Sequence, residues 1–533
     1  MERKMAKPHG EARIQIKRLW ADLGKKKDTT KTQQSITEML SLMEDGKLIT
    51  EFAMKRDLSR IIQSILKYGT QEQRDVVQEN LKEHVVELSK NNYAYYLVMK
   101  LLYYGTKEQR SAIIEKFYGR VRQLVRHKNA SNVVETAYIT YANSAQKKSL
   151  LEEFYGPEYS LFKSGEKHTL QEILNANPIK KPTILNFLKN YLFDLTNKPD
   201  ILRNSIVHKP LLQYMELAKD SDKAEMAGFM SDHLKTFLHS KDGARAAVMC
   251  IQYAPLKERK MIVKSFKGYV KKICMEQYGH WVIISVFKFV DDTVLVSKLI
   301  LKEMQQHTKE LLLDKYGRLA FLAIIKGVVV PYFPPQIVKF MEPKLIDDPQ
   351  NPGKQIATTK KLDEKRKEEL LQNLLIDFTN AISNAEAIYD FVTNENAADV
   401  IKELFDHISV EVQNKLLDLI LSWVDFTPQE ERKYHPMEKK PEPKVNIVTH
   451  PVGRVFLSRL IKNHPTLADK VMDKLKPKLL DYAKDANGSW VVLRLLQNPS
   501  SKDTCKKLLL PAKEDLSNQN PETHAPILEE LKK

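Results

Sequence analysis

This 533-residue sequence lacks the features of disulfide-rich, β-rich and membrane-spanning proteins. Its three cysteines lie far apart, which predicts a reducing compartment and no structural metal. Only 17 glycines argue against a fold with many tight β turns and favour helices joined by short connections. The longest apolar runs, at residues 281–286 and 319–325, are far shorter than the roughly 20 residues that span a bilayer. We therefore expect a folded helical protein without a membrane segment.

Motifs of the common catalytic sites are also absent. The sequence contains no glycine-rich phosphate loop of the GxxxxGK type, no HExxH, no GxSxG and no CxxC. Its acidic and histidine residues fall at ordinary solvated helix positions, without a recognisable pairing. We predict that the protein is not an enzyme and has neither a cofactor nor a metal site.

What the sequence does have is an excess of positive charge. The formal net charge is +17, and the isoelectric point is near 9.3. Such a balance favours a polyanionic partner such as nucleic acid, although a basic chain can also simply be a soluble one. Hydrophobic residues at 42% and charged residues at 29% are normal for a folded protein.

A repeat of 36 residues organises the chain. YGTQEQR at 68–74 returns as YGTKEQR at 104–110, and each copy follows an apolar helical pattern. A fixed period of this size predicts stacked helical units that bury their apolar faces against one another. A Gly or Ala precedes the variable positions of the second helix, which indicates a close backbone approach there. Further copies read DGARAAV at 242–248, YGHWVII at 278–284, YGRLAFL at 316–322, VGRVFLS at 452–458 and NGSWVVL at 487–493.

We count about eleven units, of which the fourth, fifth and ninth are the weakest. Six prolines between residues 331 and 352 predict a loop or insertion rather than a helix, and four between 428 and 443 predict a second one. The expected order is a basic N-terminal segment at 1–34 with three lysines at 25–27, about eight repeats at 35–340, a polar insertion at 341–366, further repeats at 367–510 with an insertion at 427–444, and a polar C-terminal cap or tail at 511–533.

The second helix of these units resembles that of Pumilio (PUF) repeats. In that family the first, second and fifth residues after the Gly or Ala face an RNA base, and the second inserts between neighbouring bases. The resemblance implies two base-reading triplets, one of the adenine-associated type and one of the guanine-associated type. They are Ser59, Arg60 and Gln63, and Ser131, Asn132 and Glu135.

The other units depart from such a code, since an apolar fifth residue cannot hydrogen-bond a base edge. The unit count, the insertions and the degraded code resemble the nucleolar Pumilio-like branch (PUF-A type). That resemblance implies an all-α, right-handed, L-shaped solenoid that binds RNA or DNA without sequence specificity. It also implies a place in the nucleus and nucleolus, a part in ribosomal RNA processing and large ribosomal subunit assembly, and repression of an mRNA's translation.

Aromatic and basic side chains are the remaining candidates for RNA binding. Aromatic rings can stack on unpaired bases, and cations contact phosphates, but each residue could equally belong to the packed core or to a solvated helix face. The stacking candidates are Tyr95, Tyr96, Trp281 and Trp490, with His280 as a further RNA contact. The phosphate candidates are Lys90, Lys100, Arg126, His127, Lys128, Lys241, Arg245, Lys271, Lys272 and Arg318.

We thus predict a monomeric scaffold for pre-ribosomal RNA, single- or double-stranded, whose partners include ribosome assembly proteins and whose binding can extend to DNA. The alternative is a protein-binding α-solenoid of the armadillo or HEAT kind. A continuous basic stripe on the stacked units would favour nucleic acid, whereas an acidic or apolar groove would favour a peptide.

Overall fold

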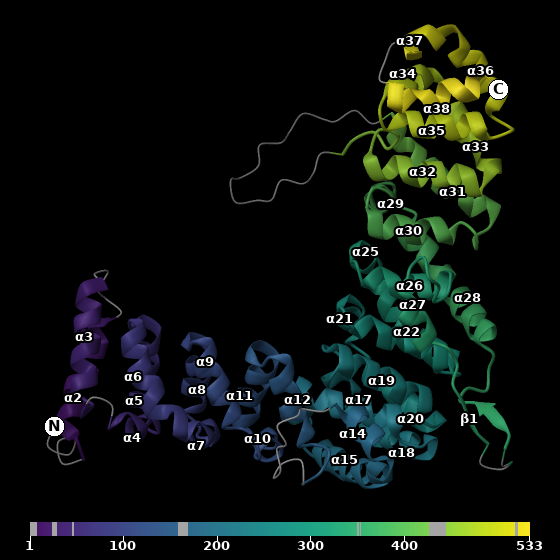
Figure 1. Ribbon diagram of the computed structural model, residues 1–533. Coiled ribbons are helices and arrows are strands. Elements are labelled where there is room, and N and C mark those ends of the chain that lie inside the picture. Colours follow the sequence, from purple (N-terminus) through teal and green to yellow (C-terminus); the bar gives the residue numbers. More distant parts are fainter. Residues whose placement is uncertain are drawn as a thin grey trace. The chain divides into compact units, whose positions relative to one another are not determined.

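Helices joined by short turns make up almost all of the molecule (Figure 1). The computed structural model describes residues 8–23, 29–44, 47–157, 169–348, 351, 353–425, 444–517 and 521–532. The chain divides into two units, residues 1–254 and 255–533. Within the described residues, every helix falls short of the length and apolarity that crossing a bilayer requires.

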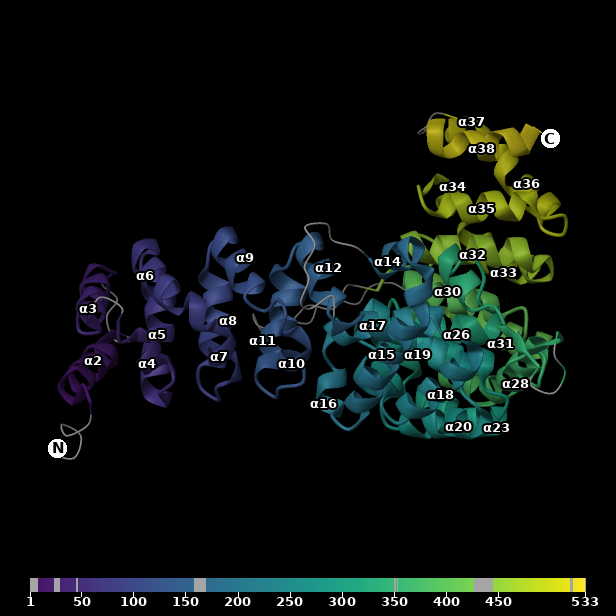
Figure 2. The ribbon, with the colours of Figure 1, turned by 60° about the horizontal axis from the view of Figure 1, so that its bottom comes forward.

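Unit 1 is a row of short helices that lie side by side in chain order (Figures 1 and 2). The second helices of successive repeats pack on one another, α5 on α8 and α8 on α11. The helices are α2 (Gly10–Leu23), α3 (Thr29–Ser41), α4 (Ile49–Ala53), α5 (Arg56–Tyr68), α6 (Gln71–Leu81), α7 (Val85–Lys90), α8 (Tyr95–Tyr104), α9 (Lys107–Glu115), α10 (Val121–Val125), α11 (Ala130–Thr136), α12 (Ser144–Glu152), α14 (Leu170–Ala176), α15 (Lys181–Thr196), α16 (Pro199–Leu202), α17 (Ser205–Leu217), α18 (Asp220–Met230) and α19 (Lys241–Tyr253), with a π turn η3 (Ala137–Tyr141) and 3₁₀ turns η2 (Lys82–His84), η4 (Pro178–Lys180) and η5 (Leu234–Thr236).

Unit 2 repeats this arrangement, with α22, α26, α30, α32, α35 and α38 each packed on the next. Its elements are α20 (Leu256–Ser265), α21 (Val270–Met275), α22 (Gly279–Phe289), α23 (Thr293–Val296), α24 (Lys302–Gln306), α25 (Thr308–Leu313), α26 (Gly317–Ile325), α27 (Pro335–Phe340), β1 (Leu345–Asp347), β2 (Gln355–Ala357), α28 (Asp363–Ile382), α29 (Ala385–Val392), α30 (Glu395–Leu404), α31 (Val410–Leu421), α32 (Pro451–Asn463), α33 (Ala468–Leu475), α34 (Leu479–Lys484), α35 (Gly488–Gln497), α36 (Lys502–Leu509), α37 (Lys513–Ser517) and α38 (Pro521–Lys532), with a π turn η6 (Ser297–Leu301) and 3₁₀ turns η7 (Ser422–Val424), η8 (Pro465–Leu467), η9 (Lys476–Lys478) and η10 (Leu510–Ala512). The predicted all-α solenoid of Pumilio-type repeats is confirmed for the described parts of both units.

The repeated YGTxEQR motif is a helix–turn–helix junction. In its first copy α5 ends at Tyr68, and Thr70 caps α6 in a capping box whose other half is Gln73. Arg74 then donates from Nε to the carbonyl of Leu66 at 2.8 Å, which satisfies the end of the preceding helix. The second copy repeats the cap at Thr106 and the arginine bond, at 2.7 Å. The motif therefore encodes the turn between two helices of one repeat.

The glutamine of the motif also joins neighbouring repeats. Gln73 donates from Nε2 to Thr37 Oγ1 at 2.9 Å, and Gln109 donates to Asp75 Oδ1 at 2.6 Å. In the next repeat Gln146 takes the same part, donating to Ser111. One residue type at one position thus closes a turn and fixes the register of the stack, which explains its recurrence.

The small residue before each second helix lies against a carbonyl six positions earlier. A Cβ built on Gly279 would lie 2.7 Å from the Ile273 oxygen, and one on Gly453 would lie 2.5 Å from the Ile447 oxygen, both too close for a real side chain. The same approach occurs at Gly243, Gly317 and Gly488. The close backbone approach predicted from sequence is confirmed.

The proline-rich stretch after residue 331 contains more structure than the sequence predicted. Pro334 and Pro335 begin α27 rather than excluding a helix, since proline is tolerated in the first turn, where its missing N–H is not needed. Strands β1 and β2 then pair antiparallel, with Ile346 opposite Ile356. The expectation of a loop without a helix was therefore wrong at α27.

A buried ion pair attaches the segment that follows this hairpin to the rest of unit 2. Arg366 of α28 is 1% exposed, and its Nη1 donates to Asp291 Oδ1 at 3.0 Å. The same carboxylate accepts the backbone N–H groups of Lys360 at 2.8 Å and Lys361 at 3.1 Å. Asp291 therefore holds both the end of the hairpin segment and the first turn of α28. The lysines at 25–27, residues 158–168 within the expected repeat array and most of the insertion at 427–444 lie outside the described residues.

Candidate nucleic-acid interface

The two predicted base-reading triplets lie on α5 and α11, with the first residue of each turned inward. Ser59 is 1% exposed, and its hydroxyl donates to the carbonyl of Tyr93 at 3.3 Å. Gln63 donates from Nε2 to Ser59 Oγ at 3.4 Å. Ser131 is likewise buried and donates to the carbonyl of Lys128 at 3.2 Å. Both serines are thus engaged in backbone contacts inside the stack.

Glu135 has a structural role that its sequence position did not suggest. Its carboxylate oxygens accept the backbone N–H groups of Ser205, at 2.6 Å, and Ile206, at 3.1 Å, at the start of α17. A carboxylate is favoured at a helix N-terminus, where the first N–H groups lack partners. Burial raises the pKa of Glu135, although these hydrogen bonds oppose the shift. The prediction that Glu135 reads a guanine edge is at odds with this arrangement.

The middle residues of the first three repeats all face outward. Arg60, Tyr96 and Asn132 are exposed on α5, α8 and α11, and the Tyr96 side chain is 53% exposed. Tyr95 lies beside Tyr96, with ring centroids 3.9 Å apart. Desolvation and the hydrogen bond with Tyr96 raise the pKa of Tyr95 to about 12. The structure therefore presents the inserting positions, rather than the edge-reading ones, to a ligand.

The phosphate candidates of unit 1 differ in how free they are. Lys128 and Lys241 are exposed, and Lys100 lies near two tyrosine rings, whereas Lys90 donates to Gln123 at 3.3 Å. Arg126 is paired with Asp194 at 2.5 Å, and Arg245 with Glu216 at 3.0 Å. His127 accepts the backbone N–H groups of Asn129 and Ala130, which makes it a turn residue in this structure. Exposed pairs of this kind cost little to break, so Arg126 and Arg245 can still exchange a carboxylate for a phosphate.

Three candidates of unit 2 lie inside the repeat stack instead. His280 is 3% exposed, stacks on Tyr316 with ring centroids 5.3 Å apart, and bonds through Nδ1 to the Glu276 carbonyl. Burial lowers the pKa of His280 to about 4, so the ring is neutral near pH 7. Trp281 is 9% exposed and packs against Tyr278, while Arg318 is held by Asp399 at 2.8 Å. His280 and Trp281 are buried and Arg318 is paired with a carboxylate, and we leave these three out of the proposed interface.

The remaining candidates of unit 2 are nearer the surface. Lys271 pairs with Glu310 at 3.0 Å, and Lys272 is exposed. Trp490 is 42% exposed on α35, with the Arg454 guanidinium 5.8 Å from its ring centroid. The ring of Trp490 is thus open, although the sequence left a place in the packed core equally possible for it.

Sequence reasoning named Lys100 but missed the tyrosines and the second lysine that lie near it at the C-terminal ends of α5 and α8. We call Tyr68, Tyr103 and Tyr104, with Lys67 and Lys100, the tyrosine cluster. Tyr68 and Tyr103 are among the exposed large side chains of the protein, at 41% and 61%. A signal was present, because Tyr103 follows Tyr96 by seven residues and so shares its helix face.

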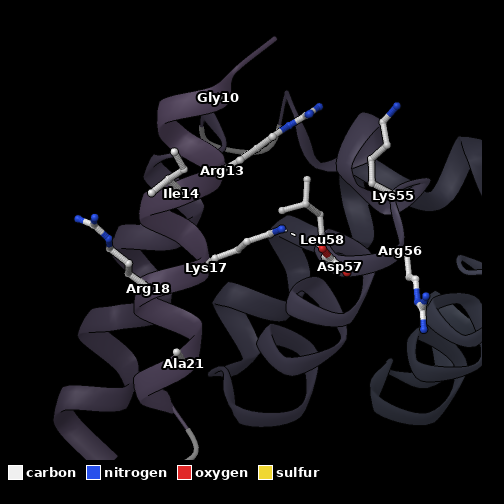
Figure 3. Close-up of a pocket in the computed structure, with 10 residues that line it drawn as sticks. All are labelled: Gly10, Arg13, Ile14, Lys17, Arg18, Ala21, Lys55, Arg56, Asp57 and Leu58. Atoms are coloured by element: carbon white, nitrogen blue, oxygen red, sulfur yellow. Dashed lines mark hydrogen bonds and ion pairs between the residues drawn. The ribbon is translucent and has the colours of Figure 1, made fainter. Parts of the chain in front are cut away.

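An open basic groove of about 950 Å³ lies between α2 and the start of α5 (Figure 3). Lys17 reaches from α2 toward α5 and pairs with Asp57 at 2.8 Å, and Arg13 pairs with Glu51 at 2.7 Å. Its other cations are Arg18, Lys55 and Arg56. Arg60 belongs to the same electrostatic neighbourhood, since the pKa of Asp57 is lowered by the hydrogen bond from Lys17 and further by the charges of Arg56 and Arg60. The groove therefore adjoins the exposed side of α5.

Across the described ranges, no group of three His, Cys, Asp or Glu residues could hold a metal ion. The three cysteines are free and buried, and burial raises the pKa of the Cys250 thiol to about 12. Such thiols are poor nucleophiles at neutral pH.

Comparison with known proteins gives two matching family models and several relatives. The Pumilio-family RNA binding repeat matches residues 59–81 and 84–116, and the CPL (NUC119) domain matches residues 313–472. Pumilio homology domain family member 6 of Saccharomyces cerevisiae is 30% identical over 478 residues, which cover 86% of this chain and 68% of that protein. Rat Pumilio homolog 3 is 33% identical over 285 residues, which cover 54% of this chain and 44% of that protein. The chain thus spans less than half the length of that relative.

Two solved structures resemble the whole chain. The crystal structure of human Puf-A superposes with a TM-score of 0.85 at 28% sequence identity, covering 98% of this chain and 100% of that one. Human Puf-A in complex with DNA gives a TM-score of 0.84 at the same identity, covering 99% and 100%.

Proposed function

The chain belongs to the Pumilio homology family, and on that premise we propose that it is a scaffold that binds RNA, and also DNA, with little regard to sequence. The matched repeat is described as RNA binding, and human Puf-A has been crystallised with DNA. Both facts concern the relatives and support the same ligand class here. A net charge of +17 suits a ligand whose backbone is a polyanion.

The proposal that binding is independent of base sequence rests on which side chains of the second helices are exposed. The second helices expose Arg60, Tyr96 and Asn132, while Ser59, Ser131 and Glu135 are engaged within the fold. Stacking on a base face and contact with a phosphate are open to every nucleotide, whereas a choice among bases needs hydrogen bonds to base edges. The exposed set therefore favours binding led by backbone and stacking.

The test is binding of the purified chain to an unstructured RNA, a duplex RNA and matched DNA across a salt series. We expect similar affinities for different sequences of equal length, with the logarithm of the binding constant falling linearly with the logarithm of salt concentration. A selected RNA that binds far more tightly than its scrambled version would contradict the proposal. Absence of binding at low salt by the folded protein would favour the peptide-binding solenoid.

We further propose the cellular setting that the PUF-A resemblance implies. The protein acts in the nucleus and nucleolus, without catalysis, as a monomer on pre-ribosomal RNA during large-subunit assembly, beside ribosome assembly proteins, and it represses translation of an mRNA. Resemblance to the nucleolar Pumilio-like branch and the similarity to human Puf-A support this setting. Sedimentation of the tagged protein with large-subunit precursors, and loss of mature large subunits on its depletion, are the expected results.

A further inference from the structure

We propose that the tyrosine cluster is a second stacking site of unit 1, which takes an unpaired base of a single-stranded segment and lies apart from the base-reading triplets. This inference rests on the proposed function, because it names a contact of the same ligand class. Its consequence is a preference of unit 1 for unpaired nucleotides over a continuous duplex.

The cluster brings aromatic and cationic groups of two repeats together. Lys100 lies over the rings of Tyr103 and Tyr104, with its Nζ 5.6 Å from each centroid, and the two rings meet edge to face at 4.7 Å. From α5, Lys67 Nζ lies 4.8 Å from the Tyr68 centroid. A hydrogen bond with Tyr68 raises the pKa of Lys67, and Tyr104 adds to the shift. The helix ends of neighbouring repeats therefore share one electrostatic surface.

The surface is built to stay open. Arg74 donates to the Leu66 carbonyl, and its guanidinium lies 5.0 Å from the Tyr104 ring centroid. This cation–π contact fixes the Tyr104 ring. Tyr103, on the adjacent position, keeps 61% of its surface exposed. Among the described residues, the contacts of Lys67 and Lys100 are with tyrosine rings and not with a carboxylate. Lys67 and Lys100, without a carboxylate partner in the described ranges, thus lie near the exposed ring of Tyr103, an arrangement that suits an anionic, planar ligand.

An unpaired nucleotide fits this surface better than a protein does. Its base offers a flat face to Tyr103 and its phosphates offer charge to Lys67 and Lys100, a combination typical of sites for single-stranded nucleic acid. Lysine is depleted in protein–protein interfaces, which makes two free lysines at the centre of such an interface less favourable. A base inside a duplex has both faces covered and cannot stack on the ring.

The site is distinct from the first stacking position. Tyr96 and Tyr103 lie on one face of α8, seven residues apart, which corresponds to about 10 Å along the helix axis. One base cannot contact both rings at that separation. The cluster therefore adds a contact beside the row formed by Arg60, Tyr96 and Asn132.

The experiment compares Tyr103→Ala with Tyr103→Phe in the full chain. The probes are a short unstructured RNA carrying one fluorescent adenine analogue and a blunt duplex RNA. Loss of the stacking ring should weaken binding of the single strand roughly 5- to 100-fold and abolish quenching of the analogue, with the duplex little affected. Tyr103→Phe keeps an aromatic face and should bind like the unchanged protein. Tyr269→Ala, at a tyrosine of unit 2 that is 47% exposed, is the matched control and should change nothing.

Each other outcome counts against the inference. If the unchanged protein binds the single strand and Tyr103→Ala binds it equally well, the cluster is not a nucleic-acid site, while the proposed function stands. Equal losses on strand and duplex, or a loss in Tyr103→Phe as large as in Tyr103→Ala, would exclude stacking on an unpaired base. If the unchanged protein binds neither probe at low salt, the proposed function fails first and the inference with it. Thermal unfolding of each variant verifies that the fold is kept.

Discussion

The same repeat geometry produces an open surface on α5, α8 and α11 of unit 1 and a more closed one on α22 and α26 of unit 2. Near the starts of α5, α8 and α11, the residues two positions after the buried Leu58, Ala94 and Ala130 are exposed. In unit 2, α22 and α26 begin with Gly279 and Gly317 pressed against a carbonyl. His280 and Trp281 of α22 are buried, and Arg318 of α26 is paired with Asp399.

The difference comes from what covers each helix. In unit 2, α22 packs against α28 as well as α26, and α26 packs against α28 and α30. Tyr316 stacks on His280, and Asp399 of α30 holds Arg318. In unit 1 the first position is engaged in the same way at Ser59 and Ser131, and it is the second position, on α5, α8 and α11, that stays exposed. A resemblance in repeat sequence therefore identifies the scaffold, and the neighbouring elements decide whether a position can meet a ligand.

The largest expected effect concerns the covered surface of unit 2. Asp291→Ala should lower the free energy of unfolding by about 3–5 kcal/mol, because it leaves the buried Arg366 with only the longer contact to the Asp363 carboxylate, at 3.5 Å. The variant also removes a charge that stabilises the buried Arg259 cation, because burial lowers the pKa of Arg259 to about 10 and Asp291 opposes that shift. Urea unfolding measures the loss. Glu310→Gln removes an exposed pair with Lys271 in the same unit and should cost less than about 1 kcal/mol. Equal costs would contradict the role given to Asp291.

The next effect is a dependence of stability on pH. Burial lowers the pKa of His280 from 6.5 to about 4, so the unfolded chain binds a proton between these values that the folded chain does not. Stability is therefore complete above pH 6.5 and falls as the pH drops toward 4, by about 3 kcal/mol in total. His280→Phe keeps a ring against Tyr316 and should flatten this part of the stability curve. Identical pH profiles of the two proteins would show that His280 is not held neutral.

Local signals in the sequence predicted much of the fold. The helical period and the small-residue positions depend on residues within one repeat, and so the stacked helical units and the close approach at Gly279 were read correctly. The β1–β2 hairpin was not predicted, because two strands of three residues are too short to show the alternation of apolar and polar residues that marks a strand. The start of α28 was not predicted either, since this helix begins within the expected insertion at 341–366.

The candidate site was harder, because its residues depend on distant partners. Glu135 is taken by backbone groups 70 and 71 residues away, and Arg318 by a carboxylate 81 residues away. Nothing in the sequence near either residue indicates these contacts. By contrast, the outward direction of Tyr96 follows from its place on an exposed helix face, which is local information.

Nucleic-acid binding by one variant from each unit tests the difference between the exposed and the buried positions. Tyr96→Ala should weaken binding of an unstructured RNA by about 1–3 kcal/mol, because it removes an exposed stacking ring without disturbing the core. His280→Phe, at a buried position, should leave the affinity unchanged. Fluorescence anisotropy at fixed salt measures both. If His280→Phe weakens binding as much as Tyr96→Ala does, the surface of unit 2 is not closed in solution.

The smallest effect is a gain of affinity at the groove beside α5. Asp57 is ionised at neutral pH, since the hydrogen bond from Lys17 lowers its pKa, and it repels phosphates while occupying a cation. Asp57→Asn should tighten nucleic-acid binding about 2- to 5-fold and steepen the salt dependence by about one phosphate contact, at a stability cost of at most about 1 kcal/mol.

Asp418→Asn provides the matched control for this gain. Asp418 pairs with Lys470 at 2.8 Å in unit 2 and is 63% exposed, nearly the same as the 64% of Asp57. Both variants change the net charge by +1, so a general electrostatic effect would raise the affinity equally in the two. A gain confined to Asp57→Asn would place phosphates in the groove between α2 and α5. Equal gains would assign the effect to overall charge and remove the groove from the interface, which would then begin at Arg60.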